Sequence, residues 1–130
     1  MQPGVLAAIA IGGALGAPLR YEVAERVHVG PGAFPWATFW TNAVGSLALG
    51  FVVILLIERF PDSRVVRPFL TAGLLGAFTT YSTFVVEVDV LIKDGRAALG
   101  IVYLLSSTVA GFTAAWAGMQ SARMVPRTIA

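Results

Sequence analysis

The stretch LLGAFTTYSTFVVE, residues 74–87, decides how this chain folds. It lies in a segment, residues 68–86, that has no charged side chain, yet every side chain at positions 79–83 carries a hydroxyl group. Consecutive residues point about 100° apart around an α-helix, so these hydroxyls cannot share one face. Gly73 and Gly76 weaken the helix just before them. We therefore expect a helix that is broken near its middle, with the hydroxyls satisfying the freed backbone groups.

The composition around this stretch is that of an integral membrane protein. Of the 130 residues, 57% are hydrophobic and only 12% are charged, whereas a soluble domain has about 25% charged residues. A helix of about 20 apolar residues crosses the hydrocarbon core of a bilayer. Uncharged segments of this kind, interrupted only by His28, cover residues 1–19, 27–57, 68–86 and 97–122. We expect an all-α, multi-pass protein of the cell membrane, a single domain of four transmembrane helices over residues 1–130, and not an enzyme.

Several other classes of protein do not fit the sequence. The first segment lacks the positive start and the cleavage site of a signal peptide, and it continues into the amphipathic RYEVAER. The chain has no cysteine, which excludes disulfides and thiolate metal sites. A net charge of +2, spread thinly, does not indicate nucleic-acid binding. His28 lies in a connection rich in Gly and Pro, where we expect a loop residue rather than a ligand.

The basic residues give a weak signal for orientation. Four spans place both chain ends on one side of the membrane, and an excess of Lys and Arg normally marks the cytoplasmic side. The terminal side would hold Arg59, Arg64, Arg67, Arg123 and Arg127, and the opposite side Arg26, Lys93 and Arg96. So small a bias indicates insertion in both orientations.

Polar and small residues recur at helical spacing within the first two spans. Gly12, Gly16 and Arg20 lie on one line, and small residues at this spacing are typical of close helix packing. Arg20 either marks the end of the first span or faces a wet cavity, where its charge would attract an anion. In the second span Thr38, Asn42 and Ser46 form a polar stripe. Asn42 is either an interhelical clamp or a hydrogen-bond donor to a passing solute.

The last two spans carry similar lines. Tyr81, Phe84 and Glu87 recur at three-residue spacing after the hydroxyl cluster, which places two rings and a carboxylate on one face. Acidic residues within membrane spans often mark a path for ions or protons. In the fourth span Tyr103 and Ser107 form a further polar line.

Taken in order along the chain, these patterns resemble one known family. GALGAPLRY (13–21), WTNAVGSLALG (40–50) and GAFTTYSTF (76–84), followed by Glu87 and the Tyr103/Ser107 line, are similar to the Fluc (CrcB) family of fluoride channels. The resemblance covers essentially the whole chain.

The resemblance implies a fluoride-selective channel that exports fluoride passively and protects the cell from fluoride toxicity. It further implies an antiparallel, dual-topology homodimer in membrane lipid, with two fluoride pores and a structural Na⁺ at the dimer centre. Backbone carbonyls of Gly76 and Thr79 would bind the Na⁺, and Arg20 would serve the vestibule. The fluoride pore would be lined by Asn42, Tyr81, Ser82, Thr83, Phe84, Glu87, Tyr103 and Ser107.

Two features depart from the family pattern, and two other functions compete. The first aromatic position, commonly Phe, is Tyr81, whose ring edge or hydroxyl would meet the fluoride. Gly111 lacks the hydroxyl that relatives can carry there, so the polar line of the fourth span has one hydroxyl fewer.

The alternative function is a small dual-topology, proton-coupled multidrug exporter, but the first span has no acid before Glu22 and carries Arg20. A non-conducting assembly protein would need only the small-residue lines.

Overall fold

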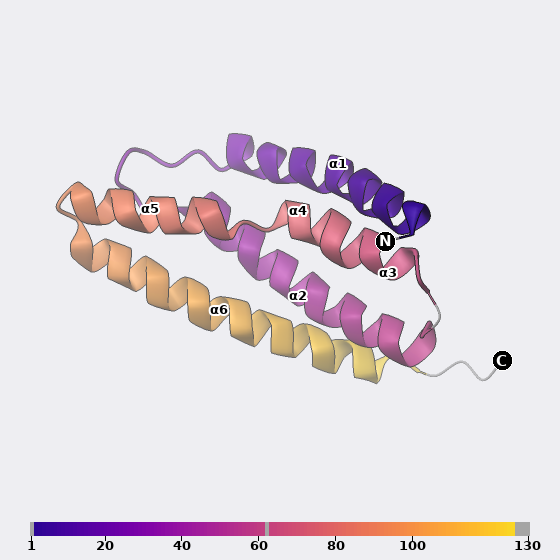
Figure 1. Ribbon diagram of the computed structural model, residues 1–130. Helices are drawn as coiled ribbons and strands as arrows, with labels where there is room; N and C mark the ends of the chain where they lie inside the picture. The colour runs from indigo at the N-terminus through magenta and orange to yellow at the C-terminus, as the bar shows by residue number, and fades with distance from the viewer. Residues whose placement is uncertain (1, 62, 127–130) are drawn as a thin grey trace.

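The four expected spans are present. The computed structural model describes residues 2–61 and 63–126, and the helices there that are long and apolar enough to cross a membrane are Pro3–Arg26, Trp36–Arg59, Val66–Lys93 and Ala97–Met124. The first span begins and the fourth span ends at the same end of the bundle (Figure 1). The all-α fold and the multi-pass arrangement predicted from the sequence are thus confirmed.

The third span differs from the other three because it is divided. The first, second and fourth spans are single helices, α1 (Pro3–Arg26), α2 (Trp36–Arg59) and α6 (Ala97–Met124). In the third span α3 (Val66–Pro68), the π-helical turn η1 (Phe69–Leu75) and α4 (Gly76–Phe78) form the first half, and α5 (Tyr81–Lys93) forms the second. The connection between α1 and α2 contains His28, as expected of a loop residue.

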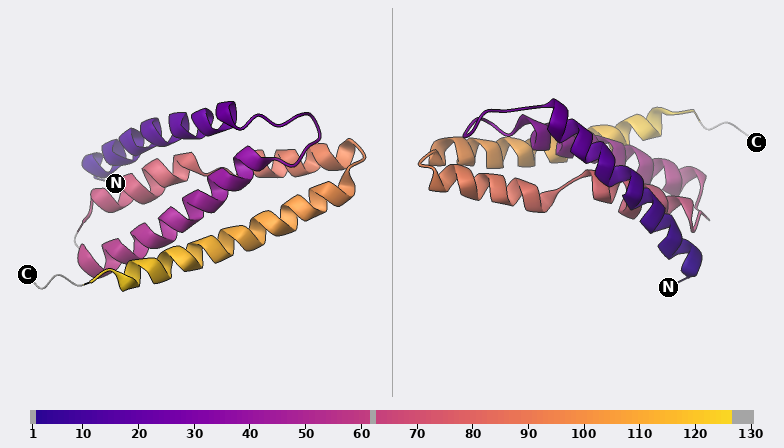
Figure 2. Two further views of the ribbon diagram at one scale, coloured as in Figure 1. Left: turned by 180° about the vertical axis from the view of Figure 1, so that it is seen from behind. Right: turned by 90° about the horizontal axis from the view of Figure 1, so that it is seen from above.

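Glycines allow α1 to lie directly against the first half of the third span. A β-carbon on Gly12 would collide with the carbonyl oxygen of Phe69, and one on Gly16 would collide with that of Leu74. From the other side, a β-carbon on Gly73 would lie 2.8 Å from the carbonyl oxygen of Ile9. Close approach through small residues is the usual basis of helix packing in lipid. The packing line expected from the first span is therefore confirmed, and Figure 2 shows α1 crossing the third span.

A second glycine contact joins α2 to α6. A β-carbon on Gly50 would collide with the carbonyl oxygen of Ala115, and one on Gly118 would collide with that of Leu47. The two helices run side by side in the same direction (Figure 1). The bundle thus has two closely packed pairs, α1 with η1 and α2 with α6, and the break in the third span lies beside α2.

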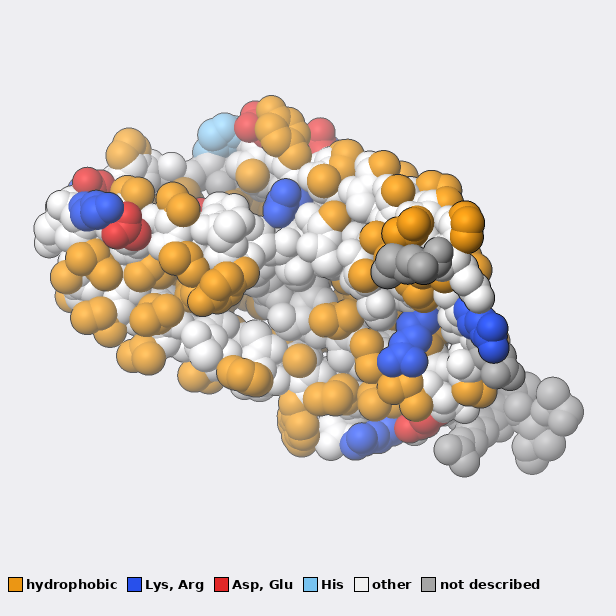
Figure 3. Space-filling view, in the orientation of Figure 1, with side chains coloured by type: hydrophobic (Ala, Val, Ile, Leu, Met, Phe, Trp, Pro, Cys, Tyr) orange, Lys and Arg blue, Asp and Glu red, His pale blue; other side chains and the backbone are white. Residues whose placement is uncertain are grey.

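Most large apolar side chains face outward. Tyr81 is 79% exposed and Phe112 is 76% exposed. Figure 3 shows hydrophobic side chains over the left and right parts of the visible face, with mainly white atoms between them and few charged side chains. In a soluble protein this surface would be unfavourable, but against lipid or another apolar surface it is expected.

Candidate functional site at the break in the third span

The break is formed by two threonines with extended backbone. Thr79 has φ −78° and ψ 158°, and Thr80 has φ −146° and ψ 119°. The Thr79 hydroxyl donates to the carbonyl oxygen of Leu75 at 2.9 Å, which stabilises the last turn of the first half. The Thr80 hydroxyl accepts a hydrogen bond from the backbone N–H of Thr83 at 3.2 Å and so caps the start of α5. The predicted break is confirmed, and hydroxyls of the cluster stabilise both of its ends.

Asn42 holds the break from the neighbouring helix α2. Its side-chain Nδ2 donates to the carbonyl oxygen of Thr80 at 2.9 Å, and the backbone N–H of Thr80 donates to Asn42 Oδ1 at 2.8 Å. Because a backbone N–H can only donate, this pair fixes which way the amide points. Of the two roles left open by the sequence, the interhelical clamp is the one formed here. One N–H of the amide is not used by this clamp.

The clamp changes the hydrogen bonding of Gly76. In a continuous helix the N–H of Thr80 would donate to the carbonyl oxygen of Gly76, four residues earlier. Here that N–H is directed to Asn42 instead. The Gly76 carbonyl oxygen therefore lacks the backbone donor that it would have in a continuous helix.

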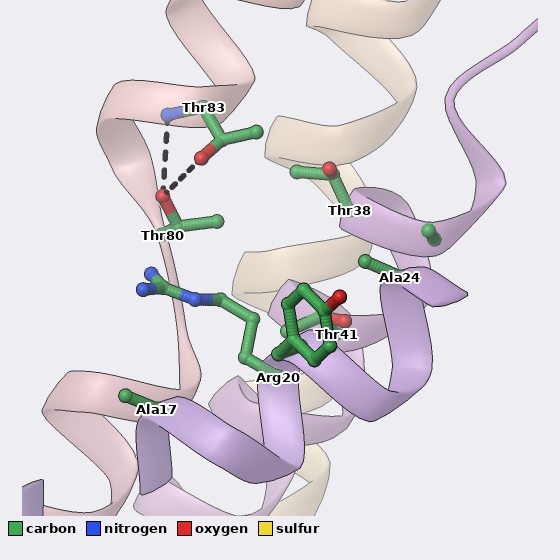
Figure 4. Close-up of a pocket in the computed structure, with 9 residues that line it drawn as sticks. Ala17, Arg20, Ala24, Thr38, Thr41, Thr80 and Thr83 are labelled. Atoms are coloured by element: carbon green, nitrogen blue, oxygen red, sulfur yellow. Dashed lines mark hydrogen bonds between the residues drawn. The ribbon is translucent and has the colours of Figure 1, made fainter. Parts of the chain in front are cut away.

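Arg20 lies in a pocket on one side of the break. Helix α1 continues beyond it to Arg26, so Arg20 does not end the helix. Its Nη1 lies 3.5 Å from the carbonyl oxygen of Thr79, a long hydrogen bond. The pocket has a volume of about 370 Å³ and is lined also by Thr38, Thr41, Thr80 and Thr83. In Figure 4 the guanidinium points toward the break, near Thr80 and Thr83. A positive charge and several hydroxyls therefore share one cavity.

A groove of about 420 Å³ lies between α2, α5 and α6 on another side of the break. It is lined by Asn42, Tyr81, Phe84 and Ser107, which are four of the residues predicted to line a pore. Phe84 is only 8% exposed and its ring centroid lies 6.1 Å from that of Tyr81, at an interplanar angle of 46°. Ser107 Oγ is buried without a hydrogen-bond partner among the described residues. An amide, a hydroxyl and two aromatic side chains thus line one groove.

Glu87 is held by two hydroxyls from other spans. Thr38 Oγ1 donates to Glu87 Oε1 at 2.7 Å, and the Tyr103 hydroxyl donates to Oε2 at 2.7 Å. Tyr103 is fully buried, and its ring meets those of Phe34 and Phe84 edge to face, with centroids 5.1 Å apart in both pairs. The carboxylate therefore has a hydrogen bond on each oxygen and is fixed between α2, α5 and α6.

The predicted site residues separate into several groups in space. Tyr103 and Ser107 share a line on α6, but Tyr103 packs with Glu87 while Ser107 faces the groove. Thr83 lines the Arg20 pocket, and Ser82 is exposed with its Oγ 3.4 Å from that of Thr80. Thr80 was not singled out from the sequence as a site residue, and neither was Thr38. The polar stripe of Thr38, Asn42 and Ser46 was the sequence feature that could have identified Thr38 as a site residue.

Comparison with known proteins identifies the group to which these features belong. Residues 7–119 match the family model described as CrcB-like protein, Camphor Resistance (CrcB). A fluoride-specific ion channel FluC 1 of Streptomyces coelicolor is 41% identical over 124 residues, which cover 95% of this chain and 80% of the relative. FluC 2 of Nocardia farcinica is 38% identical over 123 residues, covering 95% of this chain and 88% of the relative. FluC of Hydrogenovibrio crunogenus is 39% identical over 115 residues, covering 88% and 87%.

Proposed function

This chain belongs to the CrcB family of fluoride-specific ion channels, and from that premise we propose that fluoride crosses the membrane through the groove between α2, α5 and α6. By homology the protein is a multi-pass fluoride channel and not an enzyme. The main observation that supports this route is the buried hydroxyl of Ser107, which has no hydrogen-bond partner among the described residues and lies in a groove that is also lined by Asn42. Passive export of fluoride along this route would protect the cell from its toxicity.

The donors in the groove suit a small, strongly hydrated anion. A pore must replace the water around such an ion without binding it too tightly to release. Asn42 has one N–H that the clamp does not use, and Ser107 has a free hydroxyl. Neutral donors of this kind attract an anion more weakly than a buried Lys or Arg would. Fluoride would therefore pass rather than remain bound.

The aromatic rings add weak contacts at the same place. An aromatic ring is negative on its face and positive at its edge, so a ring edge attracts an anion. Phe84 is fixed by packing against Tyr103, whereas Tyr81 lies at the exposed margin of the groove. We therefore propose that the ring edge of Phe84 contacts fluoride along its path. Tyr81 would contact fluoride through either its ring edge or its hydroxyl.

The remaining predicted site residues would act around this path. Arg20 and Thr83 would form a vestibule that concentrates the anion before it enters, because a partly buried guanidinium raises the local anion concentration. Ser82 would meet the ion at the exposed start of α5. Glu87 and Tyr103 would lie beside the path as a hydrogen-bonded pair.

We propose that the working unit is an antiparallel homodimer with two pores. Tyr81 and Phe112 line the groove and are largely exposed in the single chain, so a second copy would cover an open wall of the path. The weak bias of Lys and Arg fits insertion in both orientations. Labelling the chain ends with a reagent that cannot cross the membrane, added to one face and then to the other, tests this arrangement. Chain ends that are labelled from one face only would contradict it.

A structural Na⁺ at the dimer centre is proposed to bind the carbonyl oxygens of Gly76 and Thr79. Oxygen ligands suit a hard cation, and the Asn42 clamp takes from the Gly76 oxygen the backbone donor of a continuous helix. The Thr79 oxygen is already within 3.5 Å of Arg20 Nη1, but a carbonyl oxygen has two acceptor positions. The residues therefore fit a cation that would hold two broken helices together.

Fluoride release from liposomes tests the function. Protein reconstituted with fluoride inside should release it rapidly when K⁺ and valinomycin set the potential, and should release chloride negligibly. A pH gradient without a potential separates the exporter alternative, because proton-coupled antiport would follow that gradient. Well-folded protein that releases no fluoride, or that releases chloride equally fast, would refute the proposal.

A further inference from the structure

Two serine hydroxyls in the groove have no hydrogen-bond partner within residues 2–61 and 63–126. Ser107 Oγ is buried without one. Ser46 lines the same groove and is partly exposed, and its hydroxyl makes none of the side-chain hydrogen bonds found among these residues. Hydroxyls in membrane helices commonly bond a carbonyl of their own helix. Thr108 and Ser121 do so here, donating to the carbonyl four residues earlier at 2.8 Å in each case. Ser46 and Ser107 therefore remain available to a ligand.

The two serines lie on facing helices. Ser46 follows Asn42 by one turn on α2, and Gly111 follows Ser107 by one turn on α6. A β-carbon on Gly111 would lie 3.8 Å from Ser46 Oγ, an ordinary van der Waals distance. Ser46 thus directs its hydroxyl across the groove toward the position where α6 has a glycine and no hydroxyl.

The surroundings favour an anion held by neutral donors. The groove residues near the two serines include Leu49, Phe112 and Ala115, and the described residues that line the groove include no charged side chain. An O–H group in an apolar wall is costly when nothing accepts its proton. A small anion that accepts hydrogen bonds would satisfy both hydroxyls at once.

We propose that Ser46 is a fluoride-contacting residue that, together with Ser107, forms a second subsite one helical turn beyond Asn42. This inference rests on the proposed function and adds a step to it. The ion would pass from the free N–H of Asn42 to the two serine hydroxyls, which keeps it hydrogen-bonded along the apolar groove. Ser46 from α2 would take the place of the hydroxyl that α6 lacks at Gly111.

The test compares four variants with wild-type protein in the fluoride-release assay, after size-exclusion chromatography shows an unchanged assembly. Ser46→Ala should release fluoride about tenfold more slowly, the equivalent of one hydrogen bond to an ion. Adding Gly111→Ser to Ser46→Ala should restore most of the rate, because the new hydroxyl would enter the same space. Adding Gly111→Ala instead should not, since it supplies only a methyl group. Ser121→Ala, outside the groove, should match wild type.

The outcomes separate this inference from the proposed function. If wild-type protein conducts fluoride and Ser46→Ala conducts equally well, the subsite is refuted while the channel function stands. If Ser46→Ala is slow but Gly111→Ser and Gly111→Ala behave alike in its background, the hydroxyl is not the cause and the inference also fails. Wild-type protein that releases no fluoride refutes the proposed function itself.

Discussion

Removing the Asn42 side chain should loosen the break in a way that can be measured at one residue. Asn42→Ala deletes the hydrogen bonds of 2.9 Å and 2.8 Å to the backbone of Thr80. Thr80 is 7% exposed, so its freed N–H and C=O groups have little access to water. A buried polar group left unpaired costs about 1–3 kcal/mol, so the two together cost about 2–6 kcal/mol.

Amide hydrogen exchange of the protein in detergent measures this cost directly. A loss of about 2 kcal/mol should speed exchange of the Thr80 amide by about 30-fold, because each 1.4 kcal/mol corresponds to a factor of ten. The amide of Leu91, which is buried farther along α5, should change little. Ser121→Ala is the matched control, since its hydroxyl bonds only its own helix. Unchanged protection of Thr80 in Asn42→Ala would refute the clamp, and equal acceleration at Leu91 would show general unfolding instead.

Three further predictions concern packing, the pore and the cation. Gly16→Ala should lower the free energy of unfolding in detergent by about 1–3 kcal/mol through overpacking against Leu74. Gly4→Ala is the control and should not lower it, because nothing lies within 4 Å of the added β-carbon. Equal stability of the two variants would contradict the close contact at Gly16. Phe84→Ile should strongly reduce fluoride flux while size-exclusion chromatography shows an intact dimer, and wild-type flux would remove Phe84 from the path. Replacing Na⁺ by a larger cation on both sides should weaken flux or assembly, and indifference to this exchange would count against the carbonyl site.

The number of spans and the place of the break were predictable because both depend on local sequence. Long uncharged segments determine what can cross a bilayer, and a run of hydroxyls after Gly76 determines where a helix can be interrupted at low cost. The Thr79 hydroxyl bonds the carbonyl oxygen of Leu75, four residues away, so its role also follows from local spacing.

The partners across the bundle were not predictable from spacing alone. Asn42 meets Thr80 because Gly45, on the same helix, lets the Thr79 methyl group approach α2 closely. The stripe on α2 predicted a polar face, but not that Thr38 would bond Glu87. Such contacts depend on the relative register of two helices, which only the packed bundle fixes.

The π-helical turn η1 was also absent from the expectations. The sequence predicted that Gly73 would weaken the helix, and here it lies within the wide turn. The backbone N–H of Gly76 bonds the carbonyl oxygen of Thr71, five residues earlier, as in a π-helix. This turn packs against Gly12 of α1. Its geometry therefore depends on a neighbouring helix, which the sequence of the third span alone does not reveal.

Blocking the groove chemically tests the central claim, that fluoride passes between α2, α5 and α6. The chain has no native cysteine, so Leu49→Cys would place one reactive thiol on the groove wall. Modification by a thiosulfonate reagent should abolish most of the fluoride release from liposomes, while modified Ser121→Cys, outside the groove, should still conduct. Undiminished release from fully modified Leu49→Cys protein would contradict the claim.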